Sequence, residues 1–298
     1  MCWILLIGAL STCAVPTLCT QCRAQWQLWK INTDGSGLAQ FVDTPGYHCG
    51  SPEWSPDGKY IAFDTWPVDK TWSDSQVAIV PADGSKPPRL LGPGAMPSFS
   101  PDGTQLVCHT YPARYGTHHI VVMNADGSGR EAILDHWGSP RWSPRGNRIA
   151  TVLEGNIALF DLATGKERTI LPGFLSVRQG FCISPDGRRF CFANMNGGLG
   201  LATLDNETMR ATVRPLVNSG TCYHASFAPG GERVVVGWDR DNKNMSQLYL
   251  LNLGSHDVPT LLPGQDTAHR NVNPDWSPDG TTIVFASQFP IDIPLSPK

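Results

Sequence analysis

Short, mainly apolar triplets recur along this chain at nearly regular intervals, each just after a cluster of turn-forming residues. The six triplets begin at Ile61, Leu106, Ile149, Phe190, Val234 and Ile283. Consecutive apolar residues in a strand indicate that both of its faces are covered. We therefore expect six buried strands, one in each repeat of the pattern.

The cluster before each triplet predicts a tight hairpin. Its best copies read Ser-Pro-Asp-Gly, which suits a type I turn whose last residue adopts positive φ as a G1 bulge. The equivalent positions of the motif serine are Ser55, Ser100, Ser143, Ser184, Ala228 and Ser277, which lie 41 to 49 residues apart. The predicted structural turn residues of the three clearest copies are Pro56, Asp57, Gly58, Pro101, Asp102, Gly103, Pro278, Asp279 and Gly280.

A second hairpin lies between successive motifs and is clearest at residues 31–37, 80–85 and 123–129, where Asp-Gly with nearby Ser supplies the turn. After its first 24 residues the chain starts with a hairpin of this second kind, and it ends with one of the first kind. Six of each make six four-stranded units. We therefore predict an all-β fold, a six-bladed β-propeller with four-stranded blades whose ring is closed by pairing of the N- and C-terminal hairpins.

These phrases resemble the PD40 (WD40-like) repeats of the TolB family and of the propeller domains in prolyl-oligopeptidase-type peptidases. The resemblance covers about residues 26 to 287. It implies a TolB-like propeller. Because scaffolds, enzymes and adaptors share this repeat, the resemblance does not identify a ligand.

The start of the chain reads as a leader. Residues 1–22 carry no charged side chain, and residues 3–10 are an apolar stretch of signal-peptide length. We interpret residues 1–24 as a signal peptide and residues 25–298 as a single β-propeller domain, which predicts a periplasmic or extracellular protein. Two alternatives stay open: residues 10–13 loosely resemble a lipoprotein box, and the uncharged run is long enough for a membrane anchor.

Five cysteines follow the leader, namely Cys49, Cys108, Cys182, Cys191 and Cys222. Cys182 and Cys191 flank one motif hairpin. A three-residue loop would pair Ser184 with Arg188 and turn the two sulfurs to opposite faces of the sheet. We therefore expect no disulfide between them.

Composition and motifs narrow the functional classes. The net charge is −3 and no Lys/Arg cluster is present, which argues against nucleic-acid binding. The sequence contains no G-x-S-x-G elbow, Walker A loop or HExxH motif. A binding protein is therefore favoured over an enzyme, and no catalytic residue is assigned.

Strand direction predicts where binding occurs. Both hairpin types turn at one end of each blade, so the longer connections gather at the other end with their aromatic residues and histidines. We predict a binding rim made of Trp66, Trp72, Tyr111, Tyr115, Trp238, His48, His136, His224 and His269.

The position two residues before the motif serine is polar in most blades although its neighbours are apolar. The six residues at this position are Glu53, Ser98, Arg141, Cys182, Ser226 and Asp275. Two interpretations stay open: the side chains line a central channel, or they form hydrogen bonds from blade to blade.

The functional prediction is a non-catalytic scaffold that binds a protein or carbohydrate partner as a monomer. No cofactor is predicted. The alternative is a metal-assisted polysaccharide lyase or hydrolase that resembles oligogalacturonate lyase, with rim histidines holding a divalent metal.

Overall fold

The computed structural model describes residues 23–111, 117–170, 177–205, 210–254 and 258–291. Residues 1–22 of the predicted leader and Tyr115 lie outside the described residues, whereas the last two leader residues, Arg23 and Ala24, begin the strand β1 (Arg23–Asn32). Twenty-four strands and one short 3₁₀ helix, η1 (Trp72–Asp74), make up the described secondary structure. No helix in these ranges is long and apolar enough to cross a membrane.

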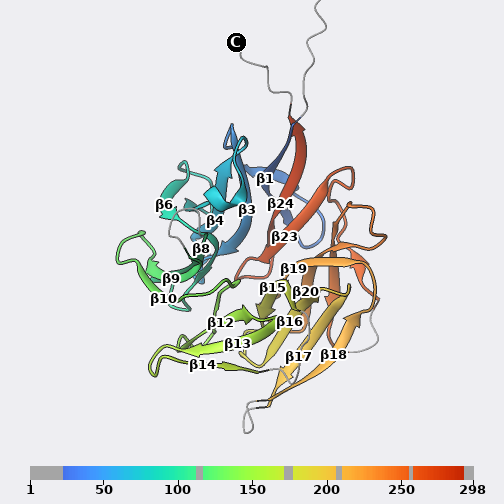
Figure 1. Cartoon of the computed structure of the whole chain (residues 1–298). Coiled ribbons are helices and arrows are strands. Elements are labelled where there is room, and N and C mark those ends of the chain that lie inside the picture. The colour runs from blue at the N-terminus through green and yellow to red at the C-terminus, as the bar shows by residue number, and fades with distance from the viewer. Residues whose placement is uncertain (1–22, 112–116, 171–176, 206–209, 255–257, 292–298) are drawn as a thin grey trace, which may run out of the picture.

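The strands form six antiparallel sheets of four, and each sheet is one blade (Figure 1). Blades 1 and 2 consist of β3 (Tyr47–Trp54), β4 (Tyr60–Pro67), β5 (Gln76–Pro81) and β6 (Arg89–Pro93), followed by β7 (Ala95–Phe99), β8 (Gln105–Thr110), β9 (His119–Asn124) and β10 (Glu131–Leu134). Blades 3 and 4 consist of β11 (Arg141–Trp142), β12 (Arg148–Leu153), β13 (Asn156–Asp161) and β14 (Lys166–Thr169), followed by β15 (Val177–Ile183), β16 (Arg189–Asn194), β17 (Leu199–Leu204) and β18 (Ala211–Val217).

Blades 5 and 6 consist of β19 (Thr221–Phe227), β20 (Arg233–Asp239), β21 (Gln247–Asn252) and β22 (Thr260–Leu261), followed by β23 (Arg270–Trp276), β24 (Thr282–Ile291), β1 (Arg23–Asn32) and β2 (Ala39–Val42). Blade 6 thus combines both ends of the chain. β1 and β24 pair without interruption from Arg23 opposite Ile291 to Asn32 opposite Thr282. The predicted propeller and its closure are confirmed.

The first strand of each blade is the innermost one, and neighbouring blades contact one another all around the ring. The predicted triplets lie on the second strands and are buried between blades. Ile61, Ala62 and Phe63, for example, have no exposed surface. Burial on both faces explains why these strands lack polar–apolar alternation.

The motif turn behaves as a tight, self-capped hairpin. At the first copy, the Ser55 hydroxyl donates to Asp57 Oδ1 at 2.7 Å, and the amide of Tyr60 donates to Ser55 Oγ at 2.9 Å. Gly58 has φ +71°, and its amide donates to the Ser55 carbonyl at 2.9 Å. The predicted turn with a final positive-φ glycine is present.

These turns also touch one another. Beside the motif glycine of each blade lies the motif proline of the preceding blade; a Cβ at Gly58 would lie 3.9 Å from Pro278 Cδ, and one at Gly103 would lie 3.7 Å from Pro56 Cδ. The remaining four blades repeat this contact. The turn end of the propeller is therefore a closed ring of prolines and glycines.

The predicted register around Cys182 and Cys191 is wrong by one residue. The Ser184 amide donates to the carbonyl of Arg189, not of Arg188, because the residue after the glycine remains in the loop. Cys182 consequently lies directly opposite Cys191 on β15 and β16, on the same face. Both thiols are free, as are those of the other three described cysteines.

Deleting residues 270–298 removes β23 and β24 and leaves β1 paired with β2 on one side only. We expect the truncated protein to aggregate, because it exposes unpaired strand edges. Size-exclusion chromatography and a thermal melt measure this outcome. Deleting only residues 292–298, which follow β24, is the control; a monomeric 270–298 deletion with the melting temperature of that control would contradict closure.

Gly58→Val should lower the free energy of unfolding by about 1–3 kcal/mol, since a β-branched residue is strained at φ +71° although the nearest atom leaves room for a side chain. Gly230→Val is the matched control, because Gly230 has no positive φ and no atom within 4 Å of an added Cβ. Urea unfolding of both variants measures the difference. Equal losses would show that the positive φ is not the cause.

Candidate functional site

A large cavity opens at the end of the propeller opposite the motif turns. Its volume is about 1070 Å³. Residues of all six blades line it, and six of the side chains are aromatic: Trp26, Trp66, Trp72, Tyr111, Trp137 and Tyr223. A concave, mainly apolar cavity that contains aromatic side chains and a few polar groups is typical of a ligand site.

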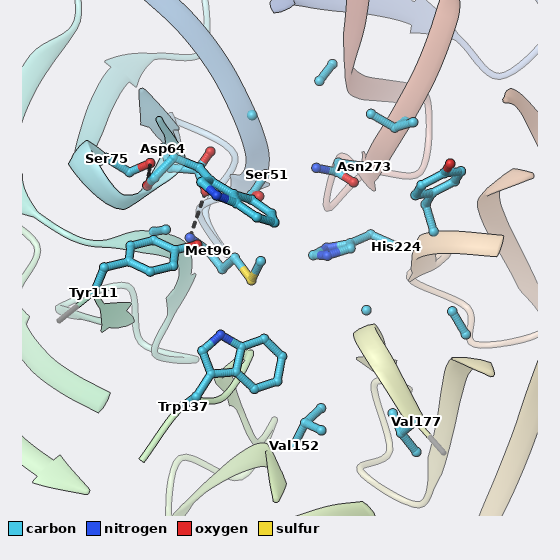
Figure 2. Close-up of a pocket in the computed structure, with 18 of the residues that line it drawn as sticks. Ser51, Asp64, Ser75, Met96, Tyr111, Trp137, Val152, Val177, His224 and Asn273 are labelled. Atoms are coloured by element: carbon cyan, nitrogen blue, oxygen red, sulfur yellow. Dashed lines mark hydrogen bonds between the residues drawn. The ribbon is translucent and has the colours of Figure 1, made fainter. Parts of the chain in front are cut away.

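Five of the six residues that stand four positions before the motif serine line this cavity, namely Ser51, Met96, Gly180, His224 and Asn273. Ser51, Met96 and Asn273 occupy this position in three blades and have φ of 43°, 53° and 52°. A register shift interrupts β3, β7 and β23 at the same point. The inner strands therefore bulge as they enter the cavity, and His224 occupies the equivalent place on β19 (Figure 2).

Asp64 on β4 stabilises one of these bulges. Its carboxylate is buried and accepts the Met96 amide at 2.9 Å, a bond that joins blade 1 to blade 2 (Figure 2). Burial raises the pKa of Asp64, while the Met96 amide and the Ser51 hydroxyl oppose that rise. A left-handed non-glycine residue is costly by about 1–3 kcal/mol, and this carboxylate helps to hold one in place.

A narrower cavity of about 310 Å³ continues along the central channel toward the motif turns. The polar positions two residues before the motif serine line it. Several of them also accept a hydrogen bond from the backbone amide of the motif aromatic residue in the next blade. The Phe99 amide donates to Glu53 at 2.7 Å, and the Trp54 amide donates to Asp275 at 2.8 Å. Both predicted roles, channel lining and blade-to-blade bonding, are therefore realised by the same side chains.

Arg141 departs from this pattern because an arginine has no acceptor. Its Nη1 lies 3.9 Å from Glu53 Oε2, and its Nη2 lies 3.4 Å from His224 Nδ1. Burial raises the pKa of Glu53 and of Asp275, and Arg141 opposes both rises. Burial and the same guanidinium lower the pKa of His224 to about 3, so its imidazole is neutral at physiological pH.

Five predicted rim residues line the large cavity: Trp66, Trp72, Tyr111, His136 and His224. Trp72 lies on η1 and is 56% exposed. His136 is held by Glu167 Oε1, 3.1 Å from its Nε2. Burial raises the pKa of Tyr111, so its hydroxyl stays protonated.

Two predicted rim histidines, His48 and His269, are not among the residues that line the cavity. His48 stacks against Trp66 with ring centres 5.1 Å apart, and its Nδ1 accepts the Trp26 amide at 3.2 Å. His269 Nδ1 lies 2.9 Å from Asp266 Oδ2.

Trp238 is buried, packs edge-on against Tyr249 and donates to the Ser219 carbonyl at 3.0 Å. It lies within a core cluster between blades and is not among the cavity residues. We therefore expect replacement of Trp238 to affect stability more than binding.

The four predicted histidines do not form one cluster. Only His136 and His224 line the cavity, and within the described ranges no group of three or more His, Cys, Asp or Glu residues has the arrangement of a metal site. A histidine-bound metal stays a prediction.

Sequence reasoning missed several cavity residues, including Trp26, Asp64, Tyr223, Arg270 and Asn273. Aligning the six repeats would have identified Asn273, because it is equivalent to Ser51 and His224. Trp26 and Arg270 belong to opposite ends of the sequence, and only ring closure brings them together.

Comparison with known proteins supports the fold. No family model matches the chain. It is 23% identical over 271 residues to an uncharacterized protein of Agrobacterium fabrum, covering 81% of this chain and 85% of that protein. It is 25% identical over 187 residues to the Tol-Pal system protein TolB of Francisella tularensis, covering 59% of this chain but only 42% of that protein.

Solved structures give the same picture. A structure from Agrobacterium tumefaciens, provisionally assigned as TolB, superposes with a TM-score of 0.70 at 18% identity and covers 90% of this chain and 100% of that chain. TolB of Acinetobacter baumannii superposes with a TM-score of 0.58 at 17% identity and covers 89% of this chain and 64% of that chain. An oligogalacturonate lyase in complex with manganese superposes with a TM-score of 0.54 at 13% identity and covers 85% of this chain and 80% of that chain. The chain thus has the fold of a TolB-like six-bladed β-propeller.

The channel carboxyls predict a pH dependence. Both Glu53 and Asp275 bind their protons more tightly in the folded protein, so their contribution to the free energy of unfolding should fall as the pH rises above their ordinary pKa values of 4.5 and 3.8, whereas His224, whose pKa is lowered, contributes in the opposite direction. Asp275→Asn should reduce this fall, because one titrating group is removed. Urea unfolding at several pH values between about 4 and 7 measures the slope.

Asp57→Asn is the control for this experiment. Hydrogen bonds from Ser55 and Lys59 lower the pKa of Asp57 to about 2, so its stabilising effect is lost only in stronger acid and it should leave the slope unchanged. Identical slopes for the wild type and Asp275→Asn would contradict the prediction.

Proposed function

We propose that this chain is an exported, non-catalytic TolB-like propeller that binds a segment of a partner protein in the aromatic cavity. One observation carries the proposal: a cavity of about 1070 Å³ is lined by six aromatic side chains from several blades. Rigid aromatic side chains are favoured anchors at protein interfaces, because they bury much apolar area at a small entropy cost.

The shape of the site supports a peptide-like ligand. The cavity leads into a narrower polar channel, so an extended segment can place apolar side chains against the mouth and a polar end toward Ser51, His224 and Asn273, which line both cavities. The similarity to a Tol-Pal system protein is a second argument for a protein partner.

The two ends of the propeller are suited to different tasks. The motif turns use their side chains to cap their own backbone, as Ser55 and Asp57 do. At the cavity end, the inner strands bulge and the connections carry Trp72 and Tyr111. We therefore assign binding to the cavity end and structural stability to the turn end.

Export is part of the proposal. It is supported by the uncharged segment of residues 1–22 with its apolar stretch. The partner would then be a periplasmic or extracellular protein.

The alternative to a protein partner is a carbohydrate ligand with lyase activity. Aromatic faces also stack on sugar rings, and the manganese-bound oligogalacturonate lyase shares the fold. Incubation with oligogalacturonide and Mn²⁺, followed by ultraviolet detection of unsaturated products, tests that activity. Turnover that requires the metal would replace the binding proposal with the enzyme.

Binding is tested with a photo-cross-linking amino acid at position 72, in the cavity, and at position 60, on the turn side. Trp72 is 56% exposed and Tyr60 is 44% exposed, so the two sites are comparable in access. We expect a periplasmic protein to be cross-linked at position 72 and not at position 60. Cross-linking only at position 60 would place the partner on the wrong end.

Trp66→Ala should then weaken binding of the identified partner by about tenfold or more. Tryptophans are enriched among the interface residues that contribute most to binding, and a tenfold change in affinity corresponds to about 1.4 kcal/mol. Tyr60→Ala should leave the affinity unchanged. Titration by calorimetry, with a thermal melt of each variant, separates loss of contact from loss of fold. Unchanged affinity for Trp66→Ala would contradict binding through the cavity.

A further inference from the structure

Arg270 has an unusual environment within the large cavity. It is the first residue of β23, where it lies opposite Gln288 of β24, and its side chain lines the cavity. Its guanidinium lies between two aromatic rings from other strands. The guanidinium carbon is 5.3 Å from the centre of the Trp26 ring on β1 and 5.9 Å from that of Tyr223 on β19.

These contacts fix the orientation of the group. Both distances fall within the range of about 6 Å in which a cation and an aromatic face attract each other. In addition, Nη2 donates to the Tyr223 hydroxyl at 3.3 Å. A planar guanidinium held on two sides by rings has little freedom to turn, so its donors point in fixed directions.

The charge of Arg270 is not neutralised within the described parts of the chain. Other arginines have acidic partners there: Arg141 approaches Glu53, and Arg148 approaches Asp161. Arg270 has no such ion pair, and its Nε is buried without an acceptor.

Two of the acidic groups at this end of the propeller are already engaged, and a third, the exposed Glu154, lines the cavity from blade 3, which lies opposite blade 6 in the ring, without an ion pair to Arg270. Asp266, four residues earlier, contacts the His269 ring at 2.9 Å. Across the cavity, Asp64 accepts the Met96 amide. The half-buried guanidinium therefore presents a positive charge to the cavity, and an anionic ligand can supply the charged partner that the described parts of the chain do not.

We propose that Arg270, held between Trp26 and Tyr223, is the subsite for a carboxylate of the bound protein segment. The inference rests on the proposed function and adds the chemical group that is recognised. A carboxylate matches the planar fork of a guanidinium and can accept two parallel hydrogen bonds from it. The aromatic walls exclude water, which strengthens this charge-assisted contact.

The carboxylate can come from an acidic side chain or from a chain terminus, and paired probes distinguish these sources. N-acetyltryptophan and N-acetyltryptophanamide differ only in a terminal carboxylate. N-acetylglutamic acid α-amide and N-acetylglutaminamide differ only in a side-chain carboxylate. Ligand-observed NMR titration gives the affinity of each probe for the full chain.

We expect the acid of at least one pair to bind about tenfold or more tightly than its amide, the size of effect that a charge-assisted hydrogen bond produces. The pair that shows the difference identifies the source. Arg270→Gln should remove the difference, and Arg270→Lys should restore part of it, because lysine keeps the charge and loses the planar fork.

Arg233→Gln is the matched control. Arg233 also lies over a tryptophan, 5.1 Å from the Trp276 ring, but it is exposed and does not line the cavity. This variant should keep the full difference between acid and amide. Thermal melts of the three variants report whether the fold is intact.

Equal affinities within both pairs, or an acid preference that survives Arg270→Gln in a folded protein, overturn the carboxylate subsite. A stronger response to galacturonic acid than to either peptide acid overturns the assignment to a protein segment. The proposed function fails separately: it fails if position 72 captures no partner even though Arg270→Gln removes the acid preference.

Discussion

The pairing of β1 with β24 joins the two ends of the chain, and the rest of the propeller depends on it. Ten consecutive residue pairs connect these strands. Because they are joined, β23 lies beside β3, and Asp275 near the C-terminus accepts the Trp54 amide of the first blade. The same closure brings Trp26 from the N-terminal strand against Arg270 from the C-terminal strand. The aromatic clamp in the cavity is therefore a product of ring closure.

The two ends of the channel differ because their backbones have different requirements. At the turn end, each Ser-Pro-Asp-Gly copy satisfies its own polar groups, and the motif proline packs beside the next glycine. At the cavity end, the inner strands bulge at Ser51, Met96 and Asn273 and leave the ladder. Bulges re-aim side chains, and they allow neighbouring blades to present different groups at equivalent positions.

The polar groups of the channel also differ in how they are compensated. Glu53 and Asp275 accept backbone amides of neighbouring blades and face Arg141, so their burial is supported by bonds that hold the ring together. Arg270 instead has aromatic faces and one tyrosine hydroxyl. Aromatic faces attract a cation but supply no hydrogen-bond acceptor along its edge, so this site is the part of the channel best prepared for an anionic group from outside.

The fold class, the number of blades and the motif turns could be predicted from the amino-acid sequence, as could the end of the propeller at which Trp66, Trp72 and Tyr111 gather. These features follow from local requirements, namely turn chemistry, apolar runs and strand direction. The register at Cys182 and Cys191 was missed because one extra loop residue after Gly187 shifts the pairing. Three features could be recognised only in the folded protein: the burial of Trp238, the hydrogen bond from the Met96 amide to Asp64, and the position of Arg270 between Trp26 and Tyr223. Each of these depends on contacts between blades, and the repeat pattern specifies that blades pack without specifying which side chains meet.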